Sequence, residues 1–225
     1  KILTDNGYAT AAFGKWHNGM QYPYHPNARG FNEFYGFCSG HWGNYFSPML
    51  EHNGKLVQGD GYITNDLTEE AMEFIEANKK NPFFLYLPYT APSAPFQHPD
   101  RKPDRPKVSH KWDSKDWQKG DRQTLKAIME RLDQGVGKVV AALESTNRLD
   151  NTLLIFCSDN GAYPIAASNS PFRGYASELF EGGIHVACMA SWPGHLPTGR
   201  VDDRPTMTFD LTASILAAAH CALPE

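Results

Sequence analysis

Three short apolar segments of this chain each end abruptly in polar or proline-rich residues. They are too short to indicate helices and are typical of strands buried in a parallel sheet; they span residues 8–13 (YATAAF), 83–87 (FFLYL) and 153–157 (LLIFC). The residues that follow them at once are GKWH (14–17), PYTAPSAP (88–95) and SDNG (158–161). Ligands of open α/β sheets gather beyond the carboxyl ends of the strands, so these endings are the natural place for a site.

Apolar residues spaced three and four apart predict helices between these strands. The longest such run predicts a helix over residues 125–143, which leads into the strand at 153–157. Asp66 followed by Glu69 resembles a capping box and predicts a helix from Asp66 to about Lys79. A strand is expected over 184–190, and Asp210 is expected to cap a helix over 211–219. This alternation predicts an α/β fold, a three-layer αβα sandwich with a mostly parallel central sheet.

The endings of the three strands carry residues suited to binding an anion and a cation. In a parallel sheet they would meet at one edge, with Arg173 nearby; the residues concerned are Lys15, His17, Ser93, Asp159 and Asn160. Asp159 and Asn160 offer two oxygens to a hard cation such as Ca²⁺ or Mg²⁺. Together with the positive side chains, such a cation suits a tetrahedral anion such as sulfate or phosphate.

Simpler interpretations of the same residues stay open. Asp159, Asn160 and Gly161 are also ordinary turn residues. Lys15 and His17, taken singly, are more typical of an ordinary surface or core position than of a site. In the long polar connection over 96–120, Trp112 and Trp117 either stack on a sugar or hold the connection against the core.

Composition excludes some classes of partner and of site. A formal net charge of −4 and a pI near 6.1 give no electrostatic basis for binding nucleic acid. No apolar run approaches the length of a membrane span. The four cysteines include no CxxC pair, which argues against a zinc cluster, and Cys157 and Cys188 are expected to be buried free thiols.

At the level of whole motifs the chain resembles the sulfatases of the alkaline-phosphatase-like superfamily. The matching segments are GYATAAFGKWH (7–17), HPNARGFNEFYGF (25–37), FFLYLPYTAPSAPF (83–96), TLLIFCSDNGA (152–162) and RGYASELFEGGIHVACMASWPG (173–194). The resemblance implies hydrolysis of sulfate esters by a formylglycine made from a Cys or Ser, with a Ca²⁺ ion that polarises the sulfate.

The resemblance also implies roles for individual residues. Asp159 and Asn160 match calcium ligands, and Lys15 and His17 match the pair that contacts the sulfate and the nucleophile. His41 falls near a position that faces the substrate. Arg173 joins it as a candidate for binding the substrate.

The sequence departs from the family pattern in several places. The nucleophile motif Cys/Ser-x-Pro-x-Arg and the first two aspartate ligands precede GKWH in the family and are expected upstream of Lys1. Ser93 replaces a histidine of the TAPHxP pattern, and Ala176 replaces a lysine of RGxK. A C-terminal small-sheet subdomain is expected to be missing. Residues 1–225 are therefore interpreted as a partial sulfatase catalytic domain that is inactive as it stands.

The resulting hypothesis is a sulfatase acting on a sulfated carbohydrate, with a sulfated small molecule or glycan as its partner. Analogy with the family favours a periplasmic or secreted location. One alternative is a degenerate relative that binds anionic glycans without hydrolysing them. Another is a phosphodiesterase or phosphatase of the same superfamily.

Overall fold

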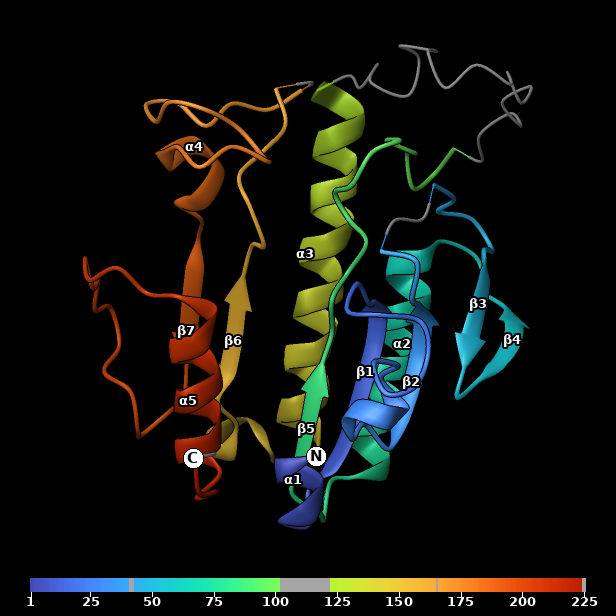
Figure 1. Cartoon of the computed structure of the whole chain (residues 1–225), viewed down its shortest axis with the longest axis vertical. Helices are drawn as coiled ribbons and strands as arrows, with labels where there is room; N and C mark the ends of the chain where they lie inside the picture. Colours follow the sequence, from blue (N-terminus) through green and yellow to red (C-terminus); the bar gives the residue numbers. More distant parts are fainter. Residues whose placement is uncertain (41–42, 102–121, 165, 224–225) are drawn as a thin grey trace.

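A five-stranded mixed sheet forms the larger half of the molecule. The computed structural model describes residues 1–40, 43–101, 122–164 and 166–223 (Figure 1). In the order β4-β3-β2-β1-β5, the last three strands are parallel: β2 (Glu33–Phe37), β1 (Ala9–Lys15) and β5 (Phe83–Tyr86). The hairpin of β3 (Met49–His52) and β4 (Lys55–Gln58) continues the sheet antiparallel to β2. The predicted parallel arrangement is thus confirmed for β1 and β5, whereas β2 was not predicted as a strand.

Strand β1 is buried on both faces, which explains its continuous apolar sequence. Ala11 and Phe13 belong to the main core, whereas Ala12 belongs to a smaller cluster with Trp16, Phe34 and Cys38. Successive side chains of a strand point to opposite faces, so these two clusters lie on opposite sides of the sheet. The smaller cluster is covered by Phe31, which follows the short helix η1 (Asn27–Arg29).

Two long helices cover the main core. Helix α2 (Ile63–Ala77) and helix α3 (Arg122–Ser145) pack against each other and bury Leu67, Ile75, Ile128 and Leu143 against the sheet. The predicted 3–4 spacing of apolar residues is confirmed in α3. At the amino terminus, α1 (Ile2–Asp5) leads into β1. Among the helices that the structure describes, none has both the length and the apolar character needed to cross a membrane.

A separate two-stranded sheet corrects the prediction for the second half of the chain. After η2 (Leu149–Asn151), β6 (Leu154–Cys157) pairs antiparallel with β7 (Cys188–Ser191). Within the described ranges β6 has no other strand partner, so the predicted strand at 153–157 exists but does not join the parallel sheet. The connection through α4 (Glu181–Ile184) remains at the carboxyl end of β6, so β7 runs back antiparallel (Figure 1). The chain ends in α5 (Thr208–Ala218).

Some predicted boundaries and environments were wrong. The expected strand at 184–190 is shorter and later, because Glu181–Ile184 forms a helical turn. Helix α5 begins at Thr208, where the Asp210 carboxylate accepts a hydrogen bond from the Met207 amide (2.8 Å). Cys157 and Cys188 are free but exposed, and they face each other across β6 and β7. The expectations for Trp112 and Trp117 lie outside the described residues.

Asp66 does not cap α2, which begins three residues earlier, at Ile63. Its carboxylate is buried and accepts hydrogen bonds from the Tyr35 hydroxyl (2.9 Å) and the Asp60 amide (3.0 Å). The predicted capping box was therefore wrong: this carboxyl joins α2 to β2 and to the turn before the helix.

Replacing Asp66 with alanine is expected to lower the free energy of unfolding by about 2 kcal/mol, because two buried donors lose their acceptor. The measurement is chemical denaturation at neutral pH. Glu69, exposed on the same helix, supplies the matched control: Glu69→Ala is expected to change the value by less than about 0.5 kcal/mol. Equal losses in the two variants would contradict this role for Asp66.

The same carboxyl should make stability depend on pH. Burial raises the pKa of Asp66 above its ordinary value, although its two hydrogen bonds oppose the shift. The folded state therefore favours the protonated form. The resulting stabilisation is fully present below the unfolded pKa and is lost as the pH rises through the folded pKa. Asp66→Ala should remove this decline from a series of denaturation curves between about pH 3 and pH 7.

Candidate functional site

Lys15 and His17 stand where β1 ends between its two parallel neighbours. The Lys15 amide donates to the carbonyl of Pro88, beyond β5 (2.8 Å), and the Trp16 amide donates to the carbonyl of Phe37, the last residue of β2 (2.9 Å). The Trp16 indole turns into the smaller core cluster. Lys15 is half-buried and His17 is exposed. The sequence GKWH thus places one indole in the core and two polar side chains at the edge of the sheet.

Glycine is required just before Lys15 because three backbones meet there. A Cβ on Gly14 would lie 2.1 Å from the Pro88 carbonyl oxygen, and one on Gly36 would lie 2.0 Å from the Gly14 carbonyl oxygen. Gly14 also has φ of +131°, which side chains disfavour. Glycine at both positions therefore lets the backbone hydrogen bonds of Lys15 and Trp16 join the ends of β1, β2 and β5.

The segment after β5 is held to the sheet by Tyr45. Its ring is fully buried, and its hydroxyl donates to the carbonyl oxygen of Ser93 (2.6 Å). The Tyr45 amide donates to the Gln97 side chain (3.0 Å). Ser93 is therefore fixed through its backbone, at the end of a segment that begins beside Lys15.

Asp159 and Asn160 follow β6 and expose both side chains. Their turn is held by other groups: the Ser158 hydroxyl donates to the Asn160 carbonyl (2.9 Å), and the Gly161 amide donates to the Gly183 carbonyl (2.9 Å). Among the residues described, neither the Asp159 carboxylate nor the Asn160 carboxamide makes a hydrogen bond or an ion pair. In many turns the aspartate side chain accepts a hydrogen bond from a backbone amide two residues further along the chain. Here the side-chain oxygens of Asp159 and Asn160 accept no such bond from the described residues and are available to a ligand.

The structure brings the two halves of the predicted site to the same end of the strands. In Figure 1, β1, β5 and β6 point in the same direction. Tyr86, at the end of β5, is paired with Ala12 of β1. Burial raises the pKa of Tyr86, and the nearby Cys157 and Asp159 raise it further, so the residues that end and follow β6 lie within electrostatic range of β5.

Arg173 lies in the loop that returns to this turn. Its guanidinium stacks on the exposed Phe180 ring, 3.7 Å from the ring centroid, and its carbonyl accepts a hydrogen bond from the Gly182 amide (2.7 Å). The Asn169 side chain bonds both backbone groups of Ala162 (2.8 and 2.9 Å) and so ties the loop to the residues after Asp159. Within the loop is a cavity of about 260 Å³ lined in part by Asn169 and Tyr175.

Two further positions bear on the predicted site. Ala176, which stands where the family pattern has lysine, is buried, and its amide donates to the Ala162 carbonyl (3.2 Å). His41 lies outside the described residues.

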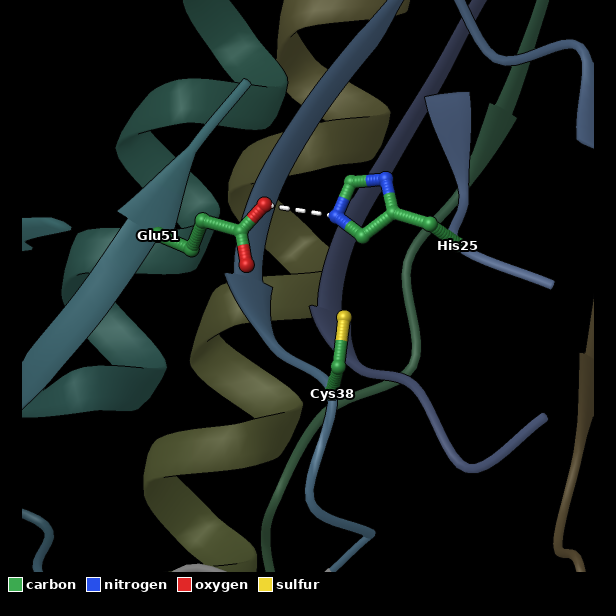
Figure 2. Close-up of side chains that lie close together, drawn as sticks. All are labelled: His25, Cys38 and Glu51. Atoms are coloured by element: carbon green, nitrogen blue, oxygen red, sulfur yellow. Dashed lines mark hydrogen bonds and ion pairs between the residues drawn. The ribbon is translucent and has the colours of Figure 1, made fainter. Parts of the chain in front are cut away.

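Sequence reasoning missed one cluster of ligand-type side chains. His25, Cys38 and Glu51 converge on the face of the sheet opposite α2, and their ligand atoms all lie within 4.8 Å of one another (Figure 2). Their spacings of thirteen residues match no metal-binding motif, so only the structure reveals the group.

Comparison with known proteins identifies the family. A sequence profile of the Sulfatase family matches residues 1–221. This chain belongs to the sulfatase family. Its lineage is therefore that of the sulfuric-ester hydrolases, and the predicted alkaline-phosphatase-like α/β fold is confirmed.

Several individual sulfatases are similar to the whole chain. It is 32% identical to the uncharacterized sulfatase YdeN of Escherichia coli (strain K12) and 31% identical to N-acetylgalactosamine-6-sulfatase of Homo sapiens, covering 44% and 45% of these proteins. Among solved structures, Ps i-CgsB in complex with k-i-k-neocarrahexaose is 37% identical, with a TM-score of 0.86 over 100% of this chain and 53% of that one. The chain thus spans about half the length of these proteins.

Gly40 offers a direct test of how His17 is positioned. Gly40 and Gly54 have similar positive φ angles (+77° and +84°), but a Cβ would meet the His17 ring at 2.0 Å only at Gly40. Alanine at either position is expected to lower stability by about 1–2 kcal/mol through backbone strain. NMR spectra of the imidazoles should show a displaced His17 in Gly40→Ala and not in Gly54→Ala. Unchanged His17 resonances in both variants would contradict this contact.

Proposed function

We propose that this protein hydrolyses sulfate esters of a carbohydrate at a site beyond the carboxyl ends of β1, β5 and β6. The observation that supports the proposal is that Lys15 and His17 lie at the carboxyl end of β1 and the uncommitted side-chain oxygens of Asp159 and Asn160 at the carboxyl end of β6, two strands that point in the same direction (Figure 1). The carbohydrate assignment draws on the relatives, one named as an N-acetylgalactosamine-6-sulfatase and one solved with a neocarrahexaose.

Asp159 and Asn160 suit a calcium ion. A carboxylate and a carboxamide are hard oxygen donors, and each is exposed without a competing partner among the described residues. They would supply two ligands of the six to eight that Ca²⁺ takes. When bound, this ion would polarise the sulfate group.

Lys15 and His17 would act on the other side of the anion. The Lys15 ammonium would bind a sulfate oxygen through a charge-assisted hydrogen bond. The His17 imidazole, exposed just beyond, would hold or transfer a proton at the ester. Because the amide of Lys15 is fixed to Pro88, its backbone does not need to reorganise when negative charge develops.

Arg173 and His41 are assigned to binding the rest of the substrate. Stacking on Phe180 orients the Arg173 guanidinium and leaves its edge open to anionic groups of a glycan. For His41 the support is its position in the resemblance to the family.

A second candidate function is binding of sulfated glycans without turnover. It is favoured by Ser93 and Ala176, which replace a histidine and a lysine of the family pattern. On either interpretation the 225-residue chain by itself is expected to be inactive. Measurable turnover of an aryl sulfate by this chain would refute that expectation.

The product of the complete gene is the material for the main test. Release of inorganic sulfate from sulfated oligosaccharides is the measurement, and Lys15→Met and Asp159→Ala are each expected to lower kcat/KM at least about 100-fold. The exposed residues Lys55 and Asp150 provide matched controls: Lys55→Met and Asp150→Ala should retain full activity.

Two results would overturn the hydrolase assignment. Binding of the oligosaccharides without sulfate release would support the glycan-binding function. Hydrolysis of phosphate esters without hydrolysis of sulfate esters would support a phosphatase or phosphodiesterase.

A further inference from the structure

We propose that His25, Cys38 and Glu51 bind one divalent cation of the zinc class, at a site distinct from Asp159 and Asn160. Figure 2 shows the three side chains converging from three segments: the loop after β1, the residue after β2, and strand β3. The nearest contact is between His25 Nε2 and Glu51 Oε1 (2.6 Å).

The types of ligand atom select the metal. A thiolate, an imidazole and a carboxylate are the three donors that zinc combines in proteins, whereas calcium takes oxygen donors alone. Cobalt and other borderline cations share this preference, so the assignment is to a chemical class. The hard oxygens of Asp159 and Asn160 would therefore not compete for the same ion.

The three donors are anchored before any metal binds. Cys38 extends β2 and is buried in the cluster with Trp16 and Phe34. The His25 ring packs edge-on against Phe34, 5.5 Å between centroids. The side chains of His25 and Glu51 are only 16% and 22% exposed. Little conformational freedom is thus left to lose on binding, which favours affinity.

Coordination requires a small rearrangement. Nitrogen and oxygen donors on a tetrahedral zinc ion lie roughly 3.3 Å apart, so Glu51 must move away from the ring by less than about 1 Å. The ligand atoms now lie within 4.8 Å of one another, so the Cys38 sulfur and the other two donors must also come closer together. The Asn27 amide donates to His25 Nδ1 (3.3 Å), so without metal the ring proton is on Nε2 and is shared with Glu51. When the metal binds Nε2, this proton moves to Nδ1, and the hydrogen bond from the Asn27 amide is lost. The Cys38 thiol releases its proton to solvent.

Burial raises the pKa of Cys38 to about 11, so the thiol carries its proton until a metal displaces it. The competing explanation is structural: His25 and Glu51 form only a hydrogen bond, and Cys38 is only a core residue. A purely structural role accounts for the packing of the three side chains, and it predicts that they bind no metal ion.

A bound cation would join the loop after β1 to β2 and β3. Cys38 lies two residues before Gly40, which contacts the His17 ring. The metal would therefore stabilise the segment that supports His17 without itself entering the sulfate site.

The test is a titration of the metal-free gene product with Co²⁺ and Zn²⁺. We expect one ion per chain at this site, with a thiolate-to-cobalt charge-transfer absorption. Cys38→Ser should abolish that absorption and lower zinc affinity at least about tenfold. The control is the double variant Cys157→Ser/Cys188→Ser, because these exposed thiols face each other and offer the main alternative site. It should retain both signals.

A second variant guards against misfolding of Cys38→Ser. Glu51→Gln can keep the hydrogen bond to His25, so in the presence of a chelator its melting temperature should equal that of the unchanged protein. Added zinc should raise the melting temperature of Glu51→Gln by less than that of the unchanged protein. Absorption that survives in Cys38→Ser, or that disappears only in the double variant, would overturn the proposal. So would the lack of any thiolate absorption in the unchanged protein.

Discussion

Contact between the backbones of Gly14, Gly36 and Pro88 fixes the edge of the sheet on which the site is built. No side chain fits at either glycine, because a Cβ there would lie about 2 Å from a carbonyl oxygen of the neighbouring segment. The Lys15 amide is hydrogen-bonded to Pro88 at this point, and Trp16 anchors the next residue in the core. Lys15 and His17 are therefore presented by a rigid support, as preorganised electrostatic stabilisation of an anion requires.

The two groups of ligand-type side chains divide by chemistry and by place. Asp159 and Asn160 offer exposed oxygens at the carboxyl end of β6, where the sulfatase lineage and the proposed sulfate chemistry call for a hard cation. His25, Cys38 and Glu51 offer softer, largely buried donors on one face of the larger sheet. The first group would act on the substrate, and the second would stabilise the loop that passes beside His17.

The parts of the fold that sequence predicts well are those governed by local pattern. The strands around residues 9–15, 83–86 and 154–157 and the long helix α3 follow from apolar runs and 3–4 spacing. The role of Asp66 could not be read in this way, because its partner Tyr35 is 31 residues away and competes with local capping. The exposure of Cys157 and Cys188 likewise depends on which strands join β6. The cluster of His25, Cys38 and Glu51 could not be found from the sequence, because its members form no known motif.

The most direct test of the account is a crystal structure of the complete gene product grown with Ca²⁺ and a sulfated oligosaccharide. We expect a cation on the side-chain oxygens of Asp159 and Asn160, with a sulfate group between that cation and the Lys15 ammonium. A cation bound elsewhere, or a sulfate group held away from Lys15 and His17, would contradict it.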